Sequence, residues 1–187
     1  MKIIRTKQII GLAVVLGVIA LGHAMATFAS AQEVSLSAPV LPAGCELLAA
    51  PQGHEVANRV YAVGVQIYRW NGSAWAFVAP EAGLFANKNY RGVVGSHYGG
   101  PTWESVSGSM VTSLATTAIP CTPDPTAIPW LRLTAVSNSG PGIFEGVTYI
   151  QRVNTVGGIR PTEPGTAIDQ EVRIPYSTEY YFYKEAN

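Results

Sequence analysis

The sequence predicts an all-β fold: a single-domain antiparallel β-sandwich or small β-barrel with long Pro/Gly-rich loops. Short runs of β-branched and aromatic residues recur along the chain, and clusters of turn residues separate them. No stretch shows a convincing amphipathic helix pattern. The composition agrees, because the 187 residues include 19 Gly and 13 Pro and only 13% are charged. We therefore expect about nine or ten short strands in one β-rich domain.

The clearest local structure is a hairpin around Asn71-Gly72. Residues 59–70 before this pair and residues 73–78 after it are rich in β-branched and aromatic side chains. An Asn-Gly pair between two such runs is typical of a type I′ turn, which needs positive φ at both central residues. Alternation along the first run puts Gln66 on the face opposite Val65.

The other expected strands are bounded by turn residues, chiefly Gly, Pro, Asn and Ser. They are residues 45–50, 90–94, 106–111, 110–114, 130–136, 147–153, 171–176 and 178–184. The expected loops and breaks are residues 51–58, 79–85, 115–129, 138–142 and 155–168.

The N-terminal residues 1–31 have the pattern of a secretory signal peptide. Residues 1–7 are basic, residues 9–21 are apolar, and Ala29-Ser30-Ala31 is a small-x-small cleavage signal. We expect cleavage there and a secreted, periplasmic or cell-surface location, with no membrane span after cleavage. The alternative is an uncleaved anchor, because about 20 apolar residues can span a bilayer.

Residues 32–44 are expected to form an extended N-terminal arm that covers part of the β-rich domain, residues 45–187. The signal peptide holds three of the 12 Lys and Arg residues, which leaves nine basic against 12 acidic residues in the mature chain. The resulting net charge of −3, without a basic patch, makes nucleic acid and anionic membranes poor partners.

Cys45 and Cys121 are the two cysteines of the chain. In an oxidising compartment two thiols most simply pair, so we expect a disulfide between them. A two-cysteine metal site would need His or carboxylate ligands at recognisable spacing, and the sequence has none nearby.

Residues 95–104 are the strongest candidate site, because they combine a Gly-Gly-Pro turn with chemically useful side chains. We expect His97, Tyr98, Trp103 and Glu104 to bind a ligand at one rim of the β-fold. The alternative is a buried corner, in which Trp103 fills the core and His97 bonds to backbone.

The sequence motifs of other catalytic and metal-binding sites are incomplete or weak in this chain. The Gly-x-Ser-x-Gly motif of serine hydrolases is absent, and Ser96 and His97 are strand neighbours that point to opposite faces. His54-Glu55 lacks the second His of a zincin motif. A carboxylate pair of Glu81 and Glu104 and a metal site of His97, His54 and Glu104 stay open as alternatives. We expect no cofactor and no resident metal.

Aromatic residues offer two interpretations. They could form an exposed stacking platform for sugar rings, or they could fill the β-core. The residues concerned are Trp70, Trp75, Tyr98, Trp103, Tyr180, Tyr181 and Tyr183.

Several blocks occur in the same order as in one known family. They are residues 64–68, 79–82, 95–98, 100–104, 128–131, 147–158 and 180–183. With these blocks the chain resembles the domain of unknown function 3455 family of secreted bacterial and fungal proteins. The block Thr-Tyr-Ile-Gln-Arg-Val-Asn-Thr at residues 148–155 is especially specific.

The resemblance implies export and a single β-rich domain, with no assigned activity, cofactor or catalytic residue. Family members often carry one Cys where this chain has Trp70 and another in the loop where it has residues 161–167. The absence of both cysteines from this chain fits the loss of one whole disulfide. A Cys45–Cys121 bond would then replace it.

Three functions follow as hypotheses. The first is a secreted, non-enzymatic β-domain that binds a glycan or protein partner near the His97–Glu104 turn. The second is a small extracellular hydrolase or metal-dependent enzyme that uses His97 and Glu104. The third is a structural envelope or surface protein.

Overall fold

The computed structural model describes residues 36–186, and the expected signal peptide therefore lies outside the described residues. This part of the chain forms nine strands and two short 3-10 helices, η1 (Glu46–Leu48) and η2 (Ala115–Thr117). The strands are β1 (His54–Trp70), β2 (Trp75–Phe85), β3 (Val93–Tyr98), β4 (Thr102–Ser105), β5 (Met110–Ser113), β6 (Ile119–Cys121), β7 (Trp130–Ser139), β8 (Tyr149–Gly157) and β9 (Glu171–Glu185). Within residues 36–186 no helix is long and apolar enough to cross a membrane.

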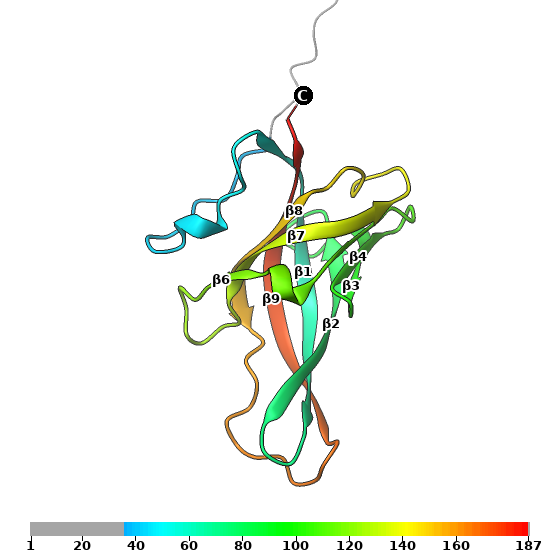
Figure 1. Cartoon of the computed structure of the whole chain (residues 1–187). Helices are drawn as coiled ribbons and strands as arrows, with labels where there is room; N and C mark the ends of the chain where they lie inside the picture. Colours follow the sequence, from blue (N-terminus) through cyan, green and yellow to red (C-terminus); the bar gives the residue numbers. More distant parts are fainter. Residues whose placement is uncertain (1–35, 187) are drawn as a thin grey trace, which may run out of the picture. The chain divides into compact units, whose positions relative to one another are not determined.

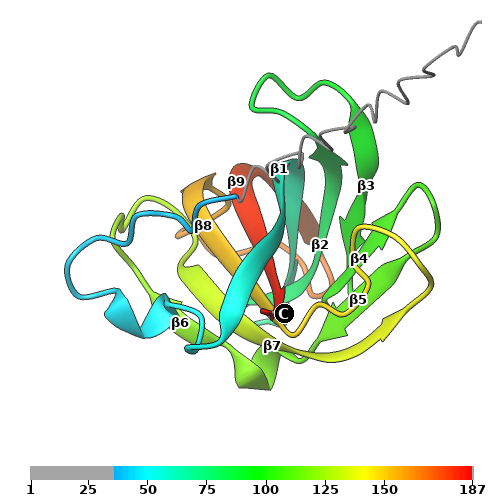
Figure 2. The same ribbon diagram turned by 90° about the horizontal axis from the view of Figure 1, so that it is seen from above.

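All nine strands belong to one antiparallel sheet that closes on itself (Figure 1). Its strand order is β5-β4-β3-β2-β1-β9-β8-β7-β6, and an additional β5–β7 pairing joins the two sides. Figure 2, which looks along the strands, shows the resulting ring. Strand β7 makes this closure possible because it pairs first with β6 through residues 130–132 and then with β5 through residues 135–139. The predicted all-β fold is confirmed, and the sheet is a barrel.

The predicted hairpin is confirmed as β1 and β2, but its turn differs from the expected type I′. Trp70 pairs with Trp75, so the loop has four residues instead of two. Gly72 has a φ of +94°, whereas Asn71 is not in the positive-φ region. Asn71 instead uses its side-chain oxygen to accept hydrogen bonds from the backbone N–H groups of Ser73 and Ala74. This side-chain cap stabilises the wider turn.

Several predicted boundaries were wrong. Residues 45–50 contain η1 instead of a strand, and the expected loop 51–58 already includes the first residues of β1. The expected break at residues 79–85 is part of β2, where Pro80 lies opposite Gln66 beside a bulge. A bulge interrupts the ladder and tolerates a Pro, which explains why the strand continues.

The barrel interior is filled mainly by apolar side chains that alternate along the strands. The largest buried members come from β4, β8, β9 and the segment between β7 and β8. They are Trp103, Phe144, Ile150, Tyr180 and Phe182, which pack with Leu84, Val111 and Val147.

A second, smaller core lies on the outer face of β8 and β9. It contains Val153, Tyr181 and Tyr183, against which Leu41 and Ala50 of the N-terminal segment pack. The segment, residues 36–53, is also held by hydrogen bonds from Gln151 to the Leu48 carbonyl and from Arg132 to the Ala49 carbonyl. The outer side of these two strands is thus covered, which explains why aromatic residues occur on both faces of β9.

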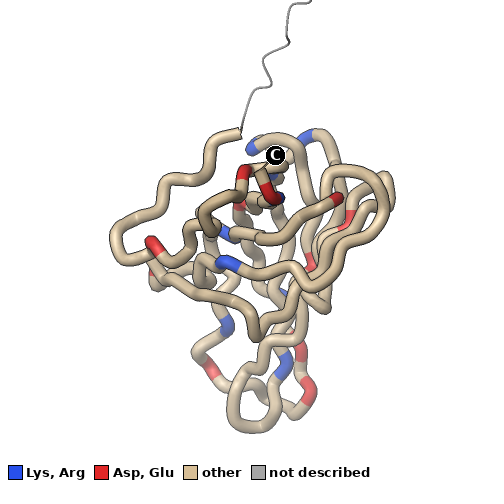
Figure 3. Tube along the Cα trace, turned by 45° about the horizontal axis from the view of Figure 1, so that its top comes forward, with Lys and Arg blue, Asp and Glu red and all other residues tan. Residues whose placement is uncertain are grey.

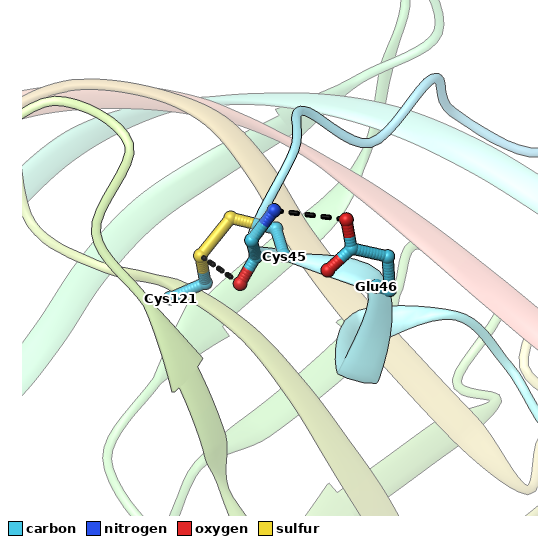
Figure 4. Close-up of a disulfide and its surroundings, with 4 residues drawn as sticks. Cys45, Glu46 and Cys121 are labelled. Carbon is cyan, nitrogen blue, oxygen red and sulfur yellow. Dashed lines mark hydrogen bonds between the residues drawn. A yellow bond between two sulfur atoms is a disulfide. The ribbon is translucent and has the colours of Figure 1, made fainter.

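The predicted disulfide is confirmed between Cys45 and Cys121, with their Cα atoms 5.6 Å apart (Figure 4). It joins the start of η1 to the end of β6. Beside it, the Glu46 carboxylate accepts a hydrogen bond from the Gly44 backbone N–H at 2.9 Å. The N-terminal segment is therefore attached to the barrel covalently as well as by packing.

Charged residues are sparse along the chain and do not gather into a patch of one sign (Figure 3). The described ion pairs lie at the surface and join Arg69 to Glu171, Arg173 to Glu81 and Lys184 to Glu55. Exposed pairs of this kind contribute little to stability.

Candidate functional site

The candidate stretch is a hairpin made of β3 and β4, and its four predicted site residues divide between two faces. His97 and Trp103 are directly opposite each other in the ladder and both point into the barrel. Tyr98 and Glu104 point outward, where the Tyr98 hydroxyl donates a 2.8 Å hydrogen bond to the Glu104 carboxylate. The hairpin therefore brings His97 and Trp103 together inside the barrel, and Tyr98 and Glu104 together on its outer surface.

His97 is 3% exposed and stacks on Trp103, with ring centroids 4.3 Å apart and planes 12° apart. Its Nδ1 donates a 2.8 Å hydrogen bond to the Thr102 carbonyl, which can only accept. The proton on Nδ1 leaves Nε2 as an acceptor. Burial lowers the pKa of His97 to about 3, although the Thr102 hydrogen bond opposes this shift. The ring is therefore neutral at physiological pH.

A cavity of about 280 Å³ lies inside the barrel beside this stack. Most of its wall is apolar, and its polar or titratable lining side chains come from β1, β3, β4, β8 and β9. The lining residues that matter here are Gln66, Phe77, Pro80, His97, Trp103, Ala118, Ile128, Leu131, Leu133, Arg152 and Tyr180.

Four buried polar atoms at this place have no hydrogen-bond partner within residues 36–186. They are Nε2 of Gln66, Nε1 of Trp103 and the hydroxyl groups of Tyr176 and Tyr180. Gln66, Trp103 and Tyr180 line the cavity and are 2%, 1% and 1% exposed. Tyr176 lies beside them. Its hydroxyl interacts with the Tyr180 and Gln66 side chains, and the Tyr180 hydroxyl also interacts with Trp103 and Arg152. None of these contacts has the geometry of a full hydrogen bond. Unpaired buried polar groups are rare because each one costs free energy.

Arg152 is the one charged side chain among the described residues that line the cavity. It lies opposite Tyr180 in the β8–β9 ladder, and its Nε and Nη2 donate to the Pro129 carbonyl at 3.1 and 2.8 Å. No described carboxylate forms an ion pair with it. Its positive charge therefore faces the cavity without a counter-charge.

Burial raises the pKa of the Tyr180 hydroxyl, and the Arg152 charge only partly opposes this shift. Burial also raises the pKa of Tyr176, and the neighbouring Tyr180 adds to that effect. Both hydroxyl groups are therefore protonated at physiological pH and can donate a hydrogen bond.

The cavity reaches the surface beside two exposed lining residues. Phe77, which is 54% exposed, and Ala115 line the open side. In the cavity wall, the hydroxyl of the buried Tyr68 donates a 2.7 Å hydrogen bond to the Gly158 carbonyl. Gly158 is required there, because a Cβ atom would come within 2.9 Å of Tyr176 and 3.1 Å of Ile128.

Sequence reasoning did not select Gln66, Arg152 or Tyr176 as site residues, and it considered Tyr180 only as a member of an exposed stacking platform. A signal for Gln66 did exist, because alternation put this polar side chain on the same face as Tyr68. Arg152 gave no comparable signal, since an arginine in a half-buried strand most often points to solvent.

The weaker chemical patterns do not converge. His97 and Glu104 lie on opposite faces of the hairpin, and the Glu81 carboxylate forms an ion pair with Arg173 at 2.7 Å. The Nδ1 of His54 bonds to the Pro51 carbonyl at 3.1 Å. Among residues 36–186 there is no group of three His, Cys, Asp or Glu side chains that could hold a metal ion.

Most of the aromatic residues considered for an exposed platform are core residues. Five of the seven are buried: Trp75, Trp103, Tyr180, Tyr181 and Tyr183. The core interpretation is therefore correct for these five, and an exposed strip made of them does not exist.

Comparison with known proteins gives a family match. No curated protein and no solved structure matches the chain. The family described as "Protein of unknown function (DUF3455)" matches residues 51–184, which include all the cavity residues and all nine strands except the last residue of β9. The order of the blocks in the sequence, the closed β-fold and this match agree, and the chain belongs to the domain of unknown function 3455 family.

Proposed function

We propose that this protein is a non-enzymatic binding protein that holds a small, largely apolar molecule inside its barrel. The observation that carries the proposal is the set of unpartnered polar atoms of Gln66, Trp103 and Tyr180 around an apolar cavity. Binding pockets typically combine apolar walls with a few convergent polar groups. A ligand would satisfy these groups. The β5–β7 pairing closes a ring of eight strands, with β6 paired to β7 outside the ring, and eight-stranded barrels can hold one small molecule.

The size of the cavity limits the ligand. A cavity of about 150 Å³ in another protein accepts benzene. At about 280 Å³ the present cavity has room for roughly twice that volume, which corresponds to about 10–14 non-hydrogen atoms. A substituted single ring, two fused rings or a short acyl chain would fit, whereas a glycan chain would not.

The proposal keeps the expected binding function and moves its location from the rim to the interior. It is supported by the inward orientation of His97 and Trp103, which the sequence had placed in one group with Tyr98 and Glu104. Binding is favoured over hydrolysis because no Asp or Glu lines the cavity among the described residues. A general acid–base pair would need such a partner within hydrogen-bond reach of His97.

We further propose that the protein acts outside the cytoplasm. The disulfide between Cys45 and Cys121 supports this location, because disulfides persist mainly in oxidising compartments. The basic and apolar N-terminal pattern of residues 1–31 supports the same location.

A thermal-shift panel tests binding directly. The panel contains indole, 2-naphthol, 2-naphthamide, 2-naphthoate, 1-octanol and octanoate, each at millimolar concentration. A ligand at 100 times its Kd stabilises the folded protein by about 2.7 kcal/mol. For a protein of this size we expect Tm to rise by roughly 5–10 °C with at least one compound.

Matched variants separate cavity binding from surface binding. Ala118→Phe puts a ring into the cavity, whereas Ala76→Phe makes the same change at an exposed position of β2 that does not line it. The Tm rise should disappear in Ala118→Phe and persist in Ala76→Phe. Absence of any shift across the panel, or an equal shift in both variants, would contradict the proposal.

A further inference from the structure

The chemistry of the cavity also indicates which polar group the ligand carries, and this inference rests on the proposed function. We propose that the ligand is a small apolar carboxylate, whose carboxylate group lies against Arg152 and accepts hydrogen bonds from the neighbouring side chains. The apolar remainder of the molecule would occupy the space between the His97–Trp103 stack and the aliphatic wall.

The first argument is charge. Arg152 places a positive guanidinium at the cavity, and no described carboxylate forms an ion pair with it. Two of its nitrogen atoms donate to the Pro129 carbonyl, and the guanidinium also interacts with the Tyr180 hydroxyl at the cavity. A positive charge in an apolar cavity disfavours a cationic ligand and favours an anion. Arginine is also the side chain that best matches the geometry of a carboxylate.

The second argument is the balance of donors and acceptors. Nε1 of Trp103 and Nε2 of Gln66 can only donate. The Trp103 side chain interacts with the Tyr180 hydroxyl and the Gln66 side chain with the Tyr176 hydroxyl, but neither nitrogen makes a full hydrogen bond within the described chain. The Tyr180 hydroxyl remains protonated and can donate as well, as its raised pKa indicates. Around this end of the cavity the unpaired groups are therefore mostly donors. An ionised carboxylate accepts about four hydrogen bonds and donates none, so it complements this set better than an alcohol or an amine does.

The third argument is the apolar wall. Ile128, Leu131 and Leu133 form one side of the cavity, and Phe77 and Pro80 form another. No further charged side chain is available among the lining residues to bind a second charge. The structure therefore fits a monoanion with an apolar body better than a dicarboxylate or a phosphate ester.

The test compares 2-naphthoate with 2-naphthamide, which have the same shape and differ in charge and hydrogen-bonding pattern. Isothermal titration of the purified protein at pH 7 should give a Kd for the carboxylate at least tenfold below that for the amide. In Arg152→Met the two compounds should bind with about equal Kd values. Arg152→Lys, which retains the charge but not the planar guanidinium, should keep part of the preference for the carboxylate.

Arg69→Met is the matched control, because it removes an arginine charge at an exposed position that does not line the cavity. It should retain the wild-type preference. If Arg152→Met does not fold, the ratio in the wild type and in Arg152→Lys still decides the question.

The outcomes separate the two proposals. Equal affinity of wild type for both compounds, or binding of neutral panel members only, would overturn the carboxylate inference and leave binding inside the barrel intact. Failure of both compounds and of the whole panel would overturn both proposals.

Discussion

At the scale of single residues, His97 shows how its position in the barrel determines its chemistry. It lies between Trp103, with which it stacks, and Tyr180, whose ring centroid is 5.2 Å away. The Arg152 charge also acts on it. Burial in such surroundings disfavours the protonated ring, so His97 acts as a neutral packing group that donates one hydrogen bond and can accept another.

The lowered pKa of His97 predicts a loss of stability in acid. Its pKa is about 3 in the folded protein against 6.5 for an ordinary His. The unfolded chain therefore takes up a proton as pH falls below 6.5, whereas the folded protein does not until about pH 3. Stability that is fully present above pH 6.5 is lost progressively as pH falls through this window.

His97→Phe tests this prediction. At pH 7 the variant should lose about 1 kcal/mol, because the hydrogen bond to Thr102 is gone. Between pH 7 and pH 5 wild type should lose roughly 2 kcal/mol more stability than the variant, since one unit of pKa shift corresponds to about 1.4 kcal/mol. Urea unfolding at the two pH values measures both quantities, and His97→Gln should reproduce the reduced pH dependence. Equal losses in wild type and both variants would show that His97 does not titrate in this way.

At the scale of elements, the far end of the β1–β2 hairpin is supported by the loop between β8 and β9. Trp75 donates a 2.8 Å hydrogen bond from Nε1 to the Glu163 carbonyl, and the Asp169 N–H bonds to the Trp70 carbonyl. Gly165 lies against the Trp70 side chain. These are the regions where the family resemblance indicated two missing cysteines, at Trp70 and within residues 161–167. A packing contact joins the two regions in this chain.

Gly165→Ala should disrupt this contact. The added Cβ would lie 2.7 Å from the Trp70 Cβ and 2.9 Å from its Cδ1, so the loop must move. We expect a loss of about 1–3 kcal/mol in urea unfolding, the usual cost of overpacking. Gly99→Ala is the control, because its new Cβ would lie 3.4 Å from Ala79, and it should cost much less.

A double-mutant cycle locates the cause of the Gly165→Ala effect. In a Trp70→Ala background the clash is absent, so Gly165→Ala should become nearly neutral. An undiminished cost in that background would mean that the effect arises from the loop backbone and not from its packing on Trp70.

At the scale of the whole molecule, one covalent bond holds the N-terminal segment over the outer core of β8 and β9. The disulfide joins residues separated by 76 positions. In addition to this bond, the segment contacts the barrel through Leu41, Leu48 and Ala50. The barrel itself closes through long-range strand pairs and does not depend on this bond for its topology.

Replacing both cysteines should therefore destabilise the protein without abolishing the barrel. For a loop of this length, chain entropy predicts a loss of about 4–5 kcal/mol for Cys45→Ala with Cys121→Ala. Tm should fall by roughly 10–15 °C. Amide hydrogen exchange should increase first in residues 36–53, while β1 and β9 stay protected. Uniform loss of protection across the strands would instead show that the segment is needed for the barrel to form.

Much of the local structure was predictable from the sequence. The alternation of side chains with a period of two identified most strands, and Asn71-Gly72 located the central hairpin. The cysteine count predicted the disulfide, and the ordered sequence blocks predicted the family. The continuous β2 was missed because Pro80 suggested a break, which the bulge beside it removed. Another error was of a different kind, since residues 45–50 were expected as a strand and contain η1.

The sequence by itself determined the all-β class, the main hairpin, the cysteine pair and the family, because short-range periodicity and composition are enough to specify them. Only the tertiary structure decided that the sheet closes through β5 and β7, that His97 faces inward while Glu104 faces outward, and that Gln66, Trp103, Arg152 and Tyr180 meet at one cavity. These features depend on the register between strands distant in sequence. That register is set by the collective burial of one face of the sheet, which no local pattern encodes.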